Sequence, residues 1–162
     1  MTLSELQFTF PDATLETWHQ HSNGGGWVQN TATVDDTAFV GPDARVLDTA
    51  WIYGNARVSG HAVVSGNAWV LDNARVSDNA GVSGNAVVSG HVVVLGEAWV
   101  WGNARVFGDA VISGDAVISG DAWVYGNALV SGDAVVTGHA LVSGGAVISG
   151  YAQVSGNDVV SE

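Results

Sequence analysis

Residues 54–77 read GNARVS, GHAVVS, GNAWVL and DNARVS, four versions of one six-residue unit. The unit extends in both directions, because every sixth residue from Val28 to Val160 is Val or Ile, at 23 positions without a gap. Two residues before each of these positions lies a small residue, which is nearly always Ala. An unbroken period of this kind requires one structural element repeated along the chain.

The order of residues within the unit predicts a short strand followed by a corner. Ala56 and Val58 are two residues apart, so they point to the same side of a strand, and their neighbours point outward. Gly followed by Asn, Asp or His then allows the left-handed backbone of a tight corner. Three such sides close one coil of 18 residues. We therefore predict an all-β fold: a single-stranded parallel β-helix of about seven triangular coils over residues 27–162, filled by Val and Ile.

Residues 1–26 lie outside the repeat, and we predict that they cap the first coil. Leu6, Phe8 and Phe10 alternate with polar residues, which indicates a half-buried strand that ends at Pro11. Residues 12–21 are expected to form a short helix or a loop. Residues 22–26, Ser-Asn-Gly-Gly-Gly, are expected to be a flexible hinge into the repeat.

The composition is acidic and contains no cysteine. Sixteen Asp and Glu residues stand against four arginines and no lysine, which gives a net charge of −12. This charge repels nucleic acids and anionic membranes, so direct binding to either is not expected. The chain has no apolar run of membrane-spanning length and no signal-peptide pattern, so a cytoplasmic location is expected. The acids would keep an apolar solenoid soluble; alternatively, they would let the protein mimic nucleic acid or inhibit a basic bacterial partner.

The units GNARVS (54–59), GNAWVL (66–71) and GDAVIS (108–113) resemble the hexapeptide repeats of the bacterial transferase hexapeptide superfamily. The segment SNGGGWVQNTATV (22–34) is similar to the start of hexapeptide-repeat proteins of bacteria and phages that are described as acyltransferases. The resemblance implies that the β-helix is left-handed. It also implies acyl transfer from coenzyme A or acyl carrier protein, and assembly into trimers with active sites between subunits.

Enzymes of that superfamily usually interrupt the repeat with a protruding loop and hold cofactor phosphates with basic groups. Here no loop interrupts residues 28–160, and no lysine is present. His61, His91 and His139 fall on three different corner edges, so they cannot converge within one subunit. We therefore expect a non-catalytic scaffold or binding protein without a cofactor. The alternative is an acyltransferase, in which Arg105 would contribute to binding coenzyme A.

One corner edge is predicted to carry a column of carboxylates. Glu97, Asp115 and Asp133 are 18 residues apart, so they should stack at about 4.8 Å intervals. Calcium accepts carboxylate oxygens in flexible geometry, so these residues are the candidate metal ligands. We expect water and counter-ions around this edge and no bound metal.

One face of the predicted prism gathers six of the fourteen aromatic residues. Side chains between two inward positions cannot reach the core, so this face should be exposed in a monomer. The expected cover is another copy of the protein, in a trimer or a dimer, and the alternative is a different protein partner. The interface candidates are Trp51, Tyr53, Trp69, Leu71, Arg105, Phe107, Trp123, Tyr125 and Leu141.

Overall fold

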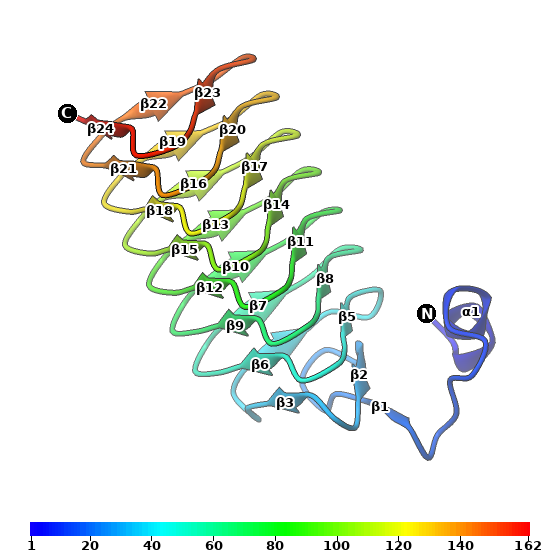
Figure 1. Ribbon diagram of the computed structural model, residues 1–162. Helices are drawn as coiled ribbons and strands as arrows, with labels where there is room; N and C mark the ends of the chain where they lie inside the picture. The colour runs from blue at the N-terminus through cyan, green and yellow to red at the C-terminus, as the bar shows by residue number, and fades with distance from the viewer.

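A computed structural model describes all residues, 1–162, as a β-solenoid with three sheets, parallel except for the first strand of one of them, and one short helix. Figure 1 shows the coils stacked in one row, with the C-terminus at one end and helix α1 (Leu3–Thr9) at the other. The stack has about eight turns, slightly more than the seven expected. The handedness implied by the resemblance stays a prediction.

Each sheet forms one wall of the solenoid and takes every third strand of the chain. Sheet A contains, in spatial order, β1 (Trp18–Gln20), β2 (Trp27–Gln29), β5 (Arg45–Val46), β8 (Val63–Val64), β11 (Gly81–Val82), β14 (Trp99–Val100), β17 (Val117–Ile118), β20 (Val135–Val136) and β23 (Gln153–Val154). Sheet B contains β3 (Thr33–Val34), β6 (Trp51–Ile52), β9 (Trp69–Val70), β12 (Val87–Val88), β15 (Arg105–Val106), β18 (Trp123–Val124), β21 (Leu141–Ser143) and β24 (Val159–Ser161). Sheet C contains β4 (Phe39–Val40), β7 (Arg57–Val58), β10 (Arg75–Val76), β13 (Val93–Val94), β16 (Val111–Ile112), β19 (Leu129–Val130) and β22 (Val147–Ile148).

The register between coils follows the period of the sequence. Val70 of β9 pairs with Val88 of β12, 18 residues later, and every parallel pair of strands repeats this offset. Inward residues therefore lie directly above one another and form one core of 40 buried residues. Each buried Val or Ile contributes about 1.5–3 kcal/mol of gross burial, before chain entropy is subtracted. This stacked core holds the outward side chains in fixed rows.

Three corners use aspartate where the repeat usually has glycine. Asp48, Asp72 and Asp78 have φ angles of 59°, 63° and 61°, a left-handed conformation that Asp tolerates better than most residues. A carboxylate oxygen of Asp72 accepts a hydrogen bond of 3.0 Å from the backbone N–H of Gly90, in the next coil. Asp48 and Asp78 make the same bond to their own next coils. These aspartates therefore stabilise the stacking of neighbouring corners.

The N-terminal segment is a helix, so the predicted strand at Leu6, Phe8 and Phe10 was wrong. Thr2 caps α1: its hydroxyl accepts from Glu5 N at 3.2 Å, while a Glu5 carboxylate oxygen accepts from Thr2 N at 2.6 Å. Such a capping box favours a helix start. Leu6 is buried, but Phe8 is 88% exposed, so the alternation did not reflect one buried face.

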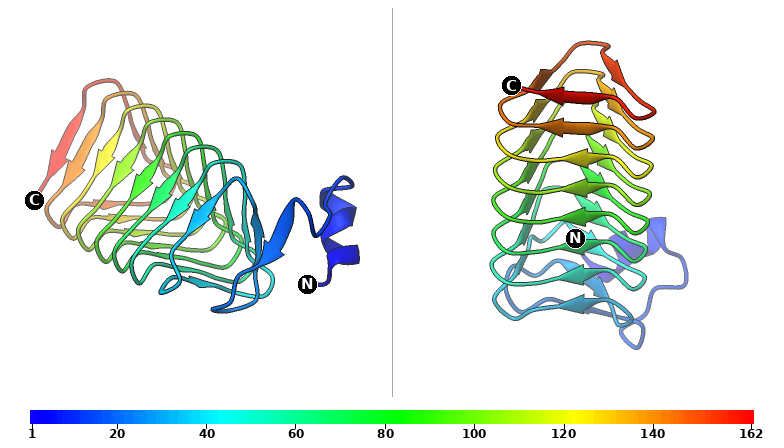
Figure 2. Two further views of the ribbon diagram at one scale, coloured as in Figure 1. Left: turned by 90° about the horizontal axis from the view of Figure 1, so that it is seen from below. Right: turned by 60° about the vertical axis from the view of Figure 1, so that its left-hand side comes forward.

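The segment that follows α1 also differs from the prediction, because residues 18–20 form strand β1. This strand pairs with β2 in antiparallel orientation. The glycine-rich segment 22–26, predicted as a flexible hinge, closes this hairpin: His21 N donates to Gly26 O at 2.8 Å, and Gly25 N donates to His21 O at 3.0 Å. Figure 2 shows β1 extending the wall that contains β2, with α1 standing beside the first coils. The cap is thus joined to the solenoid by a continuous sheet.

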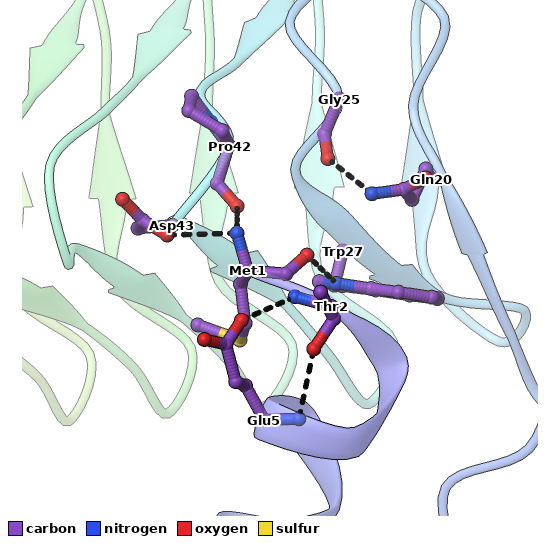
Figure 3. Close-up of polar contacts among 8 residues, drawn as sticks. All are labelled: Met1, Thr2, Glu5, Gln20, Gly25, Trp27, Pro42 and Asp43. Carbon is purple, nitrogen blue, oxygen red and sulfur yellow. Dashed lines mark hydrogen bonds and ion pairs between the residues drawn. The ribbon is translucent and has the colours of Figure 1, made fainter.

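The chain start is held against the first coils by polar contacts (Figure 3). The α-amino group of Met1 donates to an Asp43 carboxylate oxygen at 3.0 Å and to the Pro42 carbonyl at 3.2 Å. The Trp27 indole N–H donates to the Met1 carbonyl at 3.0 Å. The hydrogen bond and the charge of the amino group hold the pKa of Asp43 below its ordinary value.

We expect Asp43→Asn to loosen this attachment of the cap. Because the pKa of Asp43 is lowered in the folded protein, its contribution is complete above the ordinary carboxyl pKa. It is lost as the pH falls through the lowered value. The indole N–H resonance of Trp27 in NMR spectra should therefore shift on acidification in the natural chain, and should already be shifted at neutral pH in Asp43→Asn. Asp115→Asn, the same change on an exposed edge, is the control; equal spectra for Asp43→Asn and the natural chain would contradict the expectation.

Candidate functional site

The outward side of sheet B is the aromatic face predicted from the sequence. Trp51, Trp69 and Trp123 are 39%, 43% and 41% exposed, and Tyr53 is exposed beside them. Each of these indoles lies between an inward Ala and an inward Val or Ile, such as Ala68 and Val70 around Trp69, which are fully buried. The core therefore positions these rings by forcing the residue between two inward positions to point outward.

Two aromatic clusters occupy this face. The lower cluster consists of Trp51 on β6 with Tyr53 after it, and Trp69 on β9 with Leu71 after it. The rings of Trp51 and Trp69 stack at 5.4 Å between centroids and 12° between planes. Tyr53 stacks on Trp51 at 5.7 Å. Stacked rings of this kind make a rigid apolar surface, because each ring restricts the rotation of the next.

The lower cluster borders a groove of about 450 Å³. Asp35 and Asp72 lie at its rim together with Gly54, and no basic residue lines it. The two Asp35 oxygens accept the backbone N–H groups of Thr37 and Gly54, both at 3.4 Å, and one Asp72 oxygen accepts the N–H of Gly90 at 3.0 Å. The groove is thus apolar along its floor and negatively charged at its rim.

The upper cluster lies three coils further along and contains its own cation. The guanidinium carbon of Arg105 is 5.2 Å from the centre of the Trp123 ring, within the range of a cation–π contact. Phe107 stacks on Tyr125 at 4.9 Å and 3°, and meets Trp123 edge-on at 5.9 Å. The structure therefore brings Arg105 and its aromatic neighbours together as one group.

Smaller residues surround the two clusters. Val87 on β12 and Ser89 after it separate them and are half-buried. Leu141 on β21, beyond the upper cluster, is half-buried as well. All nine interface candidates thus lie on sheet B or at the corner next to it, eight of them in two clusters and Leu141 beyond the upper one.

Sheet A carries a separate aromatic pair, Trp99 and Trp101, which are 46% and 48% exposed. Trp99 lies over Gly81 in the coil below. A Cβ atom added to Gly81 would meet the Trp99 ring at 2.7 Å, which is too close for a real contact. Gly81 therefore creates the space in which this indole lies flat on the sheet.

The ionisable side chains do not gather into a metal site. No group of three or more His, Asp or Glu side chains lies close enough together to hold a metal ion. Glu97, Asp115 and Asp133 occupy one edge as predicted but form no such group. The nearest approach of a histidine to an acid is His139 Nδ1 to Asp121 Oδ2, at 3.7 Å on another edge.

A ladder of side-chain hydrogen bonds runs along the edge between sheets A and B, and the sequence analysis missed it. The Asn67 amide donates to Asn85 at 3.1 Å, Asn85 donates to Asn103 at 3.0 Å, and Asn103 donates to Asp121 at 2.9 Å. The Thr49 hydroxyl bonds to Asn67 at the start of the ladder. The recurrence of Asn at intervals of 18 residues is the signal that could have revealed it. The ladder stiffens the edge along which the aromatic face begins.

Helix α1 has seven residues, and the structure contains no helix long and apolar enough to cross a membrane. Four segments of the chain match the family model described as YdcK Beta solenoid repeat: residues 50–66, 56–73, 74–90 and 122–138. No curated protein matches the sequence. The matched segments lie in the stacked coils and include the whole lower cluster, and Trp123 and Tyr125 of the upper cluster. The kinship with hexapeptide acyltransferases stays a prediction, whereas the repeat match and the three parallel sheets together show that the chain is a β-solenoid repeat protein.

Proposed function

We propose that the protein is a non-catalytic scaffold whose copies assemble through sheet B. The observation that carries the proposal is the pair of half-exposed aromatic clusters on one flat wall. Trp, Tyr and Arg are the residue types that contribute most to binding energy in protein interfaces. Covering such an apolar surface releases water from it and lowers the free energy, and a second copy of the chain is the commonest cover.

The dimensions of the wall support the proposal. Eight strands at about 4.8 Å spacing give a length of roughly 35 Å, and a side of six residues gives a width of roughly 20 Å. One wall therefore offers about 700 Å². This is close to the area of about 800 Å² per partner in stable protein interfaces.

The chemistry around the groove also supports a role in binding rather than catalysis. Asp35 accepts backbone N–H groups with both carboxylate oxygens and Asp72 with one, so the corners of the solenoid hold both side chains in place. No histidine lines the groove to act as a general base beside them. What remains is a rigid apolar surface with a charged rim, which suits a protein contact.

The experiment is to measure the mass of the particle in solution by light scattering or analytical ultracentrifugation. We expect the natural chain to exceed its monomer mass of 16.6 kDa and the double variant Trp69→Asp, Trp123→Asp to be a folded monomer. Trp99→Asp is the matched control, because it changes an equally exposed indole on sheet A. A natural chain that is monomeric at all concentrations tested, or a double variant of unchanged mass, would contradict the proposal.

A further inference from the structure

The arginines of this acidic chain are all unpaired. The ion pairs of the structure are Met1 with Asp43 and His139 with Asp121, so no arginine lies within 4.0 Å of a carboxylate. Arg57, Arg75 and Arg105 are exposed, on strands β7, β10 and β15. With sixteen acidic residues in the chain, an arginine has many local partners available and uses none of them.

Arg57 and Arg75 lie on sheet C at the level of the groove on sheet B. Strand β7 follows β6 around one corner, and β10 follows β9 around the corner one coil above. The solenoid rises by about 1.6 Å from one wall to the next, a third of the strand spacing. The two arginines and the lower aromatic cluster therefore occupy the same two coils, on opposite sides of the edge between sheets B and C.

On sheet B the lower cluster lacks a cation from its own chain, as the pair Trp99 and Trp101 does on sheet A. Arg105 covers Trp123 in the upper cluster, and the guanidinium of Arg57 lies 4.2 Å from the centre of the Phe39 ring on sheet C. The groove beside Trp51 and Trp69 has two carboxylates at its rim and no basic side chain. Aromatic faces and carboxylates both attract a guanidinium group, so the groove is complementary to an arginine.

We propose that sheet C of one copy packs against sheet B of the next copy with their coils level, so that Arg75 enters the Trp51–Trp69 groove. The inference rests on the proposed assembly through sheet B and names the surface that covers it. Arg57 would reach the same rim one coil below. Further along, the outward residues of sheet C are aliphatic, and Val93 on β13 would face Val87 on β12 and Ser89 after it.

This packing uses two different walls of each copy, so it is heterologous. A repeated heterologous contact gives a ring if its rotation closes and an open filament if it does not. A two-fold packing of sheet B on itself is the competing arrangement. It would leave Arg105 as the only basic residue to meet Asp35 and Asp72 of both copies, and it would leave Arg75 outside the interface.

Charge reversal distinguishes the two arrangements. We expect Arg75→Glu to weaken association by about tenfold or more, because it places a third carboxylate at the rim of the groove. Arg105→Glu makes the same charge change on sheet B outside the groove, and we expect a smaller loss. Sedimentation equilibrium measures both. The reverse order, with Arg105→Glu the stronger variant and Arg75→Glu unchanged, would overturn the inference.

Cross-linking provides a second test that uses the absence of cysteine from the chain. Ser89 and Val93 lie on either side of the corner between β12 and β13, just above the groove, on sheets B and C. In the proposed packing, Ser89 of one copy faces Val93 of the next across walls about 10 Å apart. With a short bis-maleimide, a mixture of Ser89→Cys and Val93→Cys should give a cross-linked dimer in several-fold higher yield than either variant alone.

The outcomes separate this inference from the proposed function. If the natural chain is an oligomer and Ser89→Cys alone cross-links as well as the mixture does, sheet B packs on itself: the inference is wrong and the assembly through sheet B stands. If the natural chain is a monomer, both proposals are wrong. If the natural chain is an oligomer and only the mixture cross-links, both are supported.

Discussion

Val100→Asp is expected to leave little or no folded protein. Val100 is fully buried, and its neighbours in the core are Val82 in the coil below and Ile118 in the coil above. The carboxylate of an Asp at this position would lie between them, out of contact with water. An uncompensated buried charge costs several kcal/mol, and removal of the valine adds the loss of its packing. Because the whole stability of a domain is only about 5–15 kcal/mol, one such change removes most of it.

The measurement is the yield of soluble protein together with thermal unfolding followed by circular dichroism. Val117→Asp is the matched control, because Val117 lies in the next strand of the same sheet but points outward and is half-buried. We expect Val117→Asp to retain a cooperative transition within a few degrees of the natural chain. Equal stability of the two variants would mean that the Val and Ile column is not the core.

Gly114→Ala is expected to have the second largest effect. Gly114 has a φ of 68°, and a Cβ atom there would lie 2.9 Å from backbone atoms of Gly132 in the next coil. The left-handed conformation costs an alanine about 1–2 kcal/mol. The close backbone contact adds to this cost, because the coil above must move away and weaken its hydrogen bonds. We therefore expect a total loss of about 2–4 kcal/mol in the free energy of unfolding.

Two other glycines separate the two causes. Gly150 has a φ of 65° with no atom within 4 Å of the added Cβ, so Gly150→Ala should show only the conformational cost. Gly145 has open space and no left-handed φ, so Gly145→Ala should change stability by less than about 0.5 kcal/mol. Urea unfolding gives all three values. A Gly114→Ala variant no less stable than Gly150→Ala would show that the corners of neighbouring coils are not in close contact.

The solenoid could be predicted from the sequence because its repeat is local. Any six residues such as 66–71 contain the inward Ala68 and Val70, the outward Trp69 and the corner Gly66. Repetition then places each residue relative to its copies 18 residues away, and the pairing of Val70 with Val88 confirms that spacing. The outward position of the candidate interface residues on one wall follows from the same arithmetic.

The cap could not be predicted in this way because it has no repeat to support an interpretation. Leu6 and Phe10 suit a helix as well as the strand that was predicted. The capping box that Thr2 and Glu5 form at the start of α1 favours the helix. Trp18 and Trp27 are buried together with Leu6 and Ala13. These contacts join residues far apart in the chain, so no local sequence pattern predicts them.

The sequence by itself determined which residues point inward, which point outward and which wall each one occupies, because strand geometry and an unbroken period leave one arrangement. Only the tertiary structure decided how the outward side chains group: that Trp51 stacks on Trp69, that Arg105 turns to Trp123, and that the lower groove has acids without a cation. The physical reason is that backbone repetition sets the positions of the Cβ atoms. The rotamers beyond them depend on which neighbours in the adjacent coils leave space and which offer a ring or a charge.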